Sequence, residues 1–202
     1  MNLIKIFSIF FIVAFASLHA QINIEATTSV SGQKFKIEIS ESPEKYFISL
    51  KLLDSIQRNK QFENEMEKYG GEYFALTNKS VKSDSVKSFL NRIGILTEKN
   101  SLYSIFTTEI LKTDYKKFDH LINLFMTQNP EFFEKMESKD RIFLDGTIVK
   151  INVCKNGNGK TIWAHSPREK SHPEINNLLT STLEIFRSKN LLSSEKMITG
   201  GY

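Results

Sequence analysis

Residues 141–189 read RIFLDGTIVKINVCKNGNGKTIWAHSPREKSHPEINNLLTSTLEIFRSK and predict the clearest unit of structure in the chain. An apolar run over 141–144 stops at Asp145–Gly146, a pair that favours a tight turn. Residues 147–154 then alternate between apolar and polar side chains, which is typical of a strand with one buried face. A return strand is expected over 161–166, so the stretch predicts a β-hairpin.

The turn of this hairpin falls within NGNG at 156–159, where two Asn–Gly pairs offer competing turns. Ile162 and Ala164 are expected on the buried face of the return strand. Trp163 and His165 are then expected on the opposite face. Because a shift of one residue would reverse every side chain, the sequence leaves the register of the hairpin open.

A helix is expected after the hairpin. Ser171-His-Pro-Glu174 has the form of a capping box, with Ser171 as N-cap and Pro173 in the first turn, where its missing N–H costs little. Apolar residues then recur at helical spacing and form one stripe: Ile175, Leu178, Leu179, Leu183 and Phe186. A hairpin with an apolar face and a helix with an apolar stripe should pack against each other.

The rest of the chain predicts further strands and helices. Strands are expected at 21–25, 34–39, 46–53, 73–77 and 102–110. Helices are expected from Ser83 to Gly94 and from Thr113–Asp114 to Asn129. For 46–68 a helix is the alternative, because apolar residues at 46, 50 and 53 also fit a helical stripe.

We therefore expect an α+β fold, with a mostly antiparallel sheet and helices packed on one face. A single domain should span 21–189, with an internal boundary near 130–140 as an alternative. The polar and Gly-rich segment 190–202 is expected to be a flexible tail.

The first 20 residues have the pattern of a signal peptide. Lys5 precedes an apolar run over 6–16, and the small residue Ala20 stands before Gln21. The run is shorter than the roughly 20 residues of a spanning helix, although an uncleaved anchor is the alternative. We expect an exported protein, periplasmic or secreted, without stable membrane insertion after cleavage.

Charge and cysteine content exclude some classes of protein. The formal net charge is +4 at pH 7, and the charges of both signs are mixed along the chain. A nucleic-acid binder would show a basic stripe with interleaved aromatics, so no nucleic-acid partner is expected. A single Cys excludes an internal disulfide, so the hydrophobic core must hold the fold.

Cys154 and His165 give the sharpest enzymatic hypothesis. They lie on the two strands of one predicted hairpin, and a neighbouring His can activate a Cys thiol as a nucleophile. The competing interpretation is a small residue at a strand end and a polar surface residue, since no catalytic signature surrounds Cys154. We therefore expect a binding protein more than an enzyme.

Metal and cofactor motifs are not evident in the sequence. The histidines at 120, 165 and 172 are scattered, and no known spacing of metal ligands occurs. GNGKT at 157–161 resembles a phosphate-binding loop only superficially, because it leads into a strand and lacks the first glycine. We expect no metal and no cofactor.

Trp163 gives the best indication of a binding site. With Ile148 and His165 on the same expected face, it could form an exposed aromatic patch for a partner protein or a glycan. The competing interpretation is that a helix covers this face and that Trp163 belongs to the core.

The sequence names no chemistry, but it ranks three functions. The first is a non-catalytic binding or inhibitor-like module, whose partner would be another envelope or extracellular protein. The second is a small exported hydrolase that uses Cys154 and His165. The third is an envelope-associated structural protein held by an uncleaved N-terminal helix.

Overall fold

The computed structural model of the chain describes residues 20–28, 34–77, 83–134 and 146–193. The predicted signal peptide before Ala20, the predicted strand at 141–144 and the end of the predicted tail lie outside these described residues. Within them, no helix is long and apolar enough to cross a membrane.

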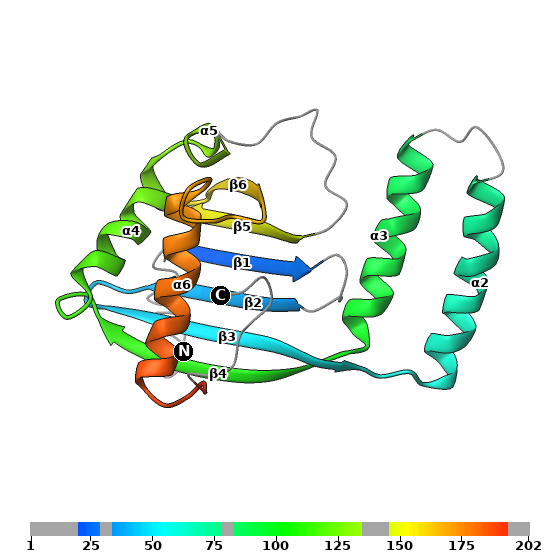
Figure 1. The fold of residues 1–202 in the computed structure, drawn as a ribbon, viewed down its shortest axis with the longest axis horizontal. Helices are drawn as coiled ribbons and strands as arrows, with labels where there is room; N and C mark the ends of the chain where they lie inside the picture. Colours follow the sequence, from blue (N-terminus) through cyan, green and yellow to red (C-terminus); the bar gives the residue numbers. More distant parts are fainter. Residues whose placement is uncertain (1–19, 29–33, 78–82, 135–145, 194–202) are drawn as a thin grey trace, which may run out of the picture. The chain divides into compact units, whose positions relative to one another are not determined.

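The fold is α+β, as the sequence predicts (Figure 1). The elements are β1 (Gln21–Thr28), β2 (Lys34–Glu41), β3 (Lys45–Ile56), α2 (Lys60–Thr77), α3 (Ser83–Lys99), β4 (Ser101–Leu111), α4 (Lys116–Thr127), α5 (Pro130–Glu134), β5 (Thr147–Lys155), β6 (Asn158–His165) and α6 (Pro173–Ser188). The strands form one antiparallel sheet in the order β4-β3-β2-β1-β5-β6.

The chain divides into two compact units. The sheet unit comprises residues 1–51 and 105–202, and the helical-hairpin unit comprises 52–104, with α2 and α3. Phe62 of α2 and Phe89 and Leu96 of α3 are buried in the hairpin unit. The hairpin is tied further by an ion pair between Arg92 and Glu72.

The core of the sheet unit follows from the alternation of its strands. One face of the sheet is buried over β1, β2, β3, β5 and β6, with Ile22, Ile24, Ala26, Phe35, Ile37, Ile39, Tyr46, Ile48, Leu50, Val149, Ile151, Val153, Ile162 and Ala164. In Figure 1, α6 crosses the strands, and α4 lies beside it and contacts it. The predicted stripe of α6 is buried, and α4 buries Phe118, Ile122 and Phe125. Period-two strands and helices of period 3.6 thus share one apolar interior.

The predicted strand at 73–77 is wrong, because α2 runs through Gly70–Gly71 to Thr77. The aromatic residues were spaced for a helix, and both Tyr69 and Tyr73 pack on Phe89 of α3, with ring centroids 6.1 and 6.0 Å apart. Tertiary packing therefore outweighs the cost of the two glycines in the helix interior.

The predicted end of the next helix at Gly94 is also wrong, because α3 continues to Lys99. Leu96 lies beyond this glycine and is buried, so its packing extends the helix by more than a turn. In contrast, the predicted strand at 46–53 is confirmed as part of β3, and the helix alternative applies only from Lys60 onward.

The β5–β6 hairpin has the predicted faces and a defined register. Lys155 pairs with Asn158, so Asn156–Gly157 forms the two-residue turn. Both turn residues have positive φ, 53° and 79°, which is the requirement of a type I′ hairpin turn. The second Asn–Gly pair therefore lies in β6.

The predicted capping box of α6 is wrong, because the helix begins at Pro173, one residue later than an N-cap at Ser171 requires, although Pro173 does lie in the first turn as predicted. His172 is the N-cap, and its side chain makes no capping hydrogen bond. The hydroxyl of Ser171 instead accepts the backbone N–H of Arg168 at 3.1 Å. The Ser171 side chain therefore stabilises a local turn and does not cap the helix.

Candidate functional site

The face of the sheet opposite the core is polar and partly exposed. We call it the polar face; its side chains on β1, β2, β5 and β6 are Gln21, Asn23, Glu25, Thr27, Lys34, Lys36, Glu38, Ser40, Ile148, Lys150, Asn152, Cys154, Thr161, Trp163 and His165. None of these side chains is buried. The polar face is therefore the part of the sheet that a binding partner could reach.

The strand register arranges the polar face in rows across the sheet. In one row Trp163 lies opposite Lys150, which lies opposite Glu25 of β1. In the next row His165 lies opposite Ile148. Because neighbouring strands are about 4.8 Å apart, side chains of one row touch or nearly touch.

Trp163 stands in an exposed position on β6, the strand at one edge of the sheet. Its side chain is 46% exposed, although it belongs to a strand whose other face is in the core. The ammonium of Lys150 lies 5.2 Å from the ring centroid, a cation–π contact that favours one orientation of the ring. The competing prediction that Trp163 is a core residue is wrong.

The residues predicted for a binding patch lie together. Ile148 is 40% exposed and is diagonal to Trp163 across the β5–β6 pair, and His165 is directly opposite Ile148. We call Trp163, Ile148, His165 and Lys150 the Trp163 patch. It combines a large amphipathic aromatic ring with an apolar side chain and a lysine. Of these, Trp is the residue type that is enriched at the energetic centres of interfaces, whereas Lys is depleted there.

A row of polar side chains borders the Trp163 patch. Thr161 donates its hydroxyl to Asn152 Oδ1 at 2.9 Å, and Asn152 lies opposite Asn23 of β1. Gln21, in the neighbouring row opposite Cys154, donates its side-chain N–H to Asn23 Oδ1 at 3.3 Å. These amides and hydroxyls can both donate and accept hydrogen bonds, so they suit the polar rim of an interface.

Lys150, Asn152 and the residues of β1 are the part of the site that sequence reasoning missed. The sequence did contain the signal for Lys150 and Asn152, because the period-two alternation puts both residues on the same face of the strand as Ile148. No local signal places β1 between β2 and β5, because that pairing joins distant parts of the chain.

Helix α5 covers the outer edge of the strand that carries Trp163. The backbone N–H of Trp163 donates to Glu134 Oε1 at 2.7 Å, and Lys160 donates to the carbonyl of Gln128. Burial lowers the pKa of the Lys160 ammonium. These contacts hold β6 at its free edge, and therefore fix the strand on which the aromatic ring stands.

The hairpin does not bring Cys154 and His165 together. Cys154 lies opposite Gly159, whereas His165 lies opposite Ile148 at the other end of the ladder. Six residues of strand separate these two positions, a distance of about 20 Å. Cys154 is an exposed free thiol, and the geometry does not supply the pair that the hydrolase hypothesis requires.

Among the described residues, no three His, Cys, Asp or Glu side chains are grouped as metal ligands would be.

Two hollows lie away from the Trp163 patch. One of about 710 Å³ lies between α4 and α6 and is floored by Phe118 and Ile185. The other, of about 470 Å³, lies beside Phe47 on β3 and Thr107 on β4.

No protein-family model matches the chain, and no curated protein matches it.

Proposed function

We propose that this protein is a non-catalytic binding module, which binds another envelope or extracellular protein through the Trp163 patch. The observation that carries the proposal is the exposure of Trp163 on the face of the sheet opposite the core. An exposed indole ring costs little conformational entropy on binding and buries a large area, which is why Trp is enriched at binding hot spots.

The arrangement around the ring supports the same proposal. Lys150 orients the indole by its cation–π contact, and α5 fixes the strand through Glu134. A side chain that is already held in place loses less entropy when a partner binds. In this proposal the helices of the sheet unit pack on one face of the sheet and leave the polar face open to the partner.

Export is a separate part of the proposal, and it rests on the pattern of residues 1–20. Cleavage before Gln21 would release the protein into the periplasm or the medium, whereas an uncleaved segment would keep it at the membrane. Mass spectrometry of the protein from a host that exports it distinguishes the two, since a chain that still begins at Met1 contradicts cleavage.

Trp163 is the single tryptophan of the chain, so its fluorescence reports directly on the patch. A partner is first captured from the native envelope or extracellular fraction and purified. It is then titrated into the wild-type protein, and we expect the emission of Trp163 to shift to shorter wavelength as the ring is buried. Trp163→Ala should weaken binding by at least about tenfold, as measured by calorimetry.

Phe47→Ala is the matched control for this experiment. Phe47 is 49% exposed on β3, so the variant removes an equally exposed aromatic ring outside the Trp163 patch. We expect its affinity for the partner to equal that of the wild type. A partner that binds Trp163→Ala as tightly as the wild type would exclude the Trp163 patch as the binding surface.

A further inference from the structure

The two edge strands of the sheet differ in what covers them. β6 forms one edge and is covered by α5, whereas β4 forms the other edge. The part of β4 that belongs to the sheet unit is Ile105–Leu111, with the sequence IFTTEIL. It contains no Pro, no Lys and no Gly, and Glu109 is its one charged residue, so it has few of the sequence devices that usually protect an exposed edge.

The outward backbone groups of β4 are identified by two hydrogen bonds. The N–H of Lys112 donates to the carbonyl of Glu44 at 3.0 Å, so the even-numbered residues direct their backbone groups towards β3. The odd-numbered residues Ile105, Thr107 and Glu109 must then direct theirs away from the sheet. The carbonyl of Glu109 agrees, because it accepts the ammonium of Lys189 at 2.6 Å.

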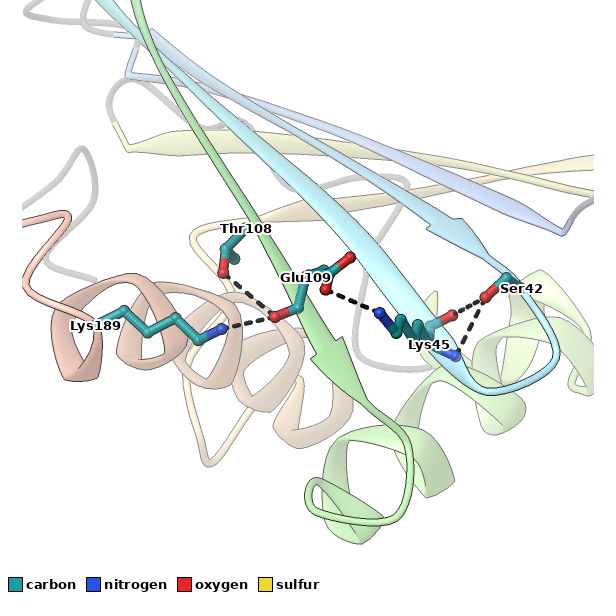
Figure 2. Close-up of polar contacts among 5 residues, drawn as sticks. All are labelled: Ser42, Lys45, Thr108, Glu109 and Lys189. Carbon is teal, nitrogen blue, oxygen red and sulfur yellow. Dashed lines mark hydrogen bonds and ion pairs between the residues drawn. The ribbon is translucent and has the colours of Figure 1, made fainter.

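Lys189 lies just beyond α6 and reaches the edge of β4, as Figure 2 shows. Within the described residues, it makes the one contact from outside the sheet to the backbone of Ile105–Glu109. The side chain of Glu109 points to the other side and pairs with Lys45 at 2.9 Å. The carboxylate is therefore neutralised within its own chain, while the backbone edge remains available over Ile105 and Thr107.

The exposed strand is complementary to itself. If two copies align antiparallel about Thr108, Ile105 lies opposite Leu111 and Phe106 lies opposite Ile110. Thr107 then lies opposite Glu109, and no two like charges meet. Ile105 and Leu111, which are 61% and 41% exposed in one copy, would cover each other. In this alignment the odd-numbered residues also face one another, as the outward hydrogen-bonding groups require.

We propose that two copies of this protein pair through β4, antiparallel about Thr108. In a single copy, Lys189 opposes this pairing because its ammonium binds a backbone carbonyl of the same edge. In the pair, the N–H of Thr107 of one copy donates to the Glu109 carbonyl of the other, the acceptor that in a single copy takes the Lys189 ammonium at 2.6 Å and a longer contact of 3.4 Å from the Thr108 hydroxyl. The lysine and the second copy therefore compete for one oxygen. This dimer uses the edge opposite β6 and is independent of the Trp163 patch.

Sedimentation velocity over a concentration series tests the dimer, with three variants. Lys189→Met removes the competing ammonium and should lower the dissociation constant by about threefold to tenfold. Thr107→Pro removes an outward N–H and should abolish the dimer, while the hydrogen bonds to β3 remain. Thr107→Val keeps the backbone edge and should still dimerise.

The proline variant must keep its fold for this comparison, which far-UV circular dichroism and an unchanged Trp163 emission spectrum establish. Hydrogen exchange gives a direct readout, since the amides of Ile105 and Thr107 should become protected as concentration rises. A wild type and a Lys189→Met variant that both stay monomeric overturn the proposal. A dimer that persists in Thr107→Pro also overturns it, because that variant lacks the outward N–H that the proposed pairing requires.

Discussion

The hydroxyl of Tyr46 donates a 2.7 Å hydrogen bond to Asp119 Oδ1, which joins β3 to α4 beneath the sheet. The tyrosine side chain is fully buried and packs edge-on against Phe118, with ring centroids 5.8 Å apart. Burial, followed by the hydrogen bond and the negative charge of Asp119, raises the pKa of Tyr46 above its ordinary value. This residue is therefore both a packing element and a titratable group of the core.

Replacement of Tyr46 by Phe should lower the free energy of unfolding by about 1–2 kcal/mol at neutral pH, because the buried hydrogen bond is lost. The wild type should also lose stability as pH rises above about 10, where a tyrosine of the unfolded chain ionises while folded Tyr46 keeps its proton. The variant lacks this group, so its own decline should be smaller. Urea unfolding between pH 7 and 11 measures both effects.

Tyr73→Phe serves as the control for the alkaline measurement, since Tyr73 is 51% exposed. It should decline with pH as the wild type does. If Tyr46→Phe and the wild type lose stability in parallel above pH 10, the hydroxyl is not held in its protonated form by the core.

Two glycines should respond in opposite directions to replacement by alanine. Gly146 has φ of +121°, and an added Cβ would meet the Ser166 Oγ at 2.2 Å. Gly146→Ala should therefore destabilise the protein by about 1–3 kcal/mol. Gly94 lies inside α3 with nothing within 4 Å of an added Cβ, so Gly94→Ala should stabilise that helix by about 0.5–1 kcal/mol.

Thermal unfolding followed by circular dichroism compares the two variants. The result for Gly94 also tests the helix itself, because a chain that ended its helix at this glycine would gain nothing from alanine. A loss of stability in Gly94→Ala would argue for a helix end at this residue.

The local signals of the sequence predicted much of the fold, and the reasons are visible in particular residues. Alternation in 147–154 and in 34–39 was sufficient for β5 and β2, because each strand has one face in the core. The short aromatic run at 73–77 was misassigned, since four apolar residues fit either period and the contact of Tyr73 with Phe89 decides between them. Packing between elements is not a local property of the sequence.

The candidate site was predictable to a similar extent. Trp163, Ile148 and His165 follow from the alternation within one hairpin, and the structure places them on one face. The distance between His165 and Cys154 depends on which Asn–Gly pair forms the turn. The residue types alone are compatible with a turn at either pair. The polar residues of β1 depend on a pairing between distant segments, which no local pattern encodes.

The turn itself can be tested by two further glycine substitutions. Gly157 has φ of +79° at the second turn position, so Gly157→Ala should cost about 1 kcal/mol. Gly159 is a strand residue with its nearest atom, the Val153 carbonyl oxygen, 3.9 Å from an added Cβ. Gly159→Ala should change stability by less than about 0.5 kcal/mol. Denaturant unfolding measures both changes in stability. If Gly159→Ala were the more destabilising of the two, the turn would lie at the second Asn–Gly pair.

The reactivity of Cys154 should be independent of His165. The ladder holds the two residues at opposite ends of the β5–β6 pair, and Cys154 is exposed to solvent. The rate of alkylation by iodoacetamide at pH 7 should therefore be the same in the wild type and in His165→Ala. Lys150→Met, which changes the Trp163 patch without touching either residue, is the control for general effects on the hairpin.

A rate that falls about tenfold in His165→Ala but not in Lys150→Met would show that the two side chains meet. That outcome would require a different register of the hairpin, because no rotation of the side chains spans six residues of strand. It would revive the exported hydrolase, with Cys154 as nucleophile and His165 as base. An unchanged rate would show that Cys154 is an ordinary surface thiol. Trp163 would then be the residue of this face on which the proposed function depends.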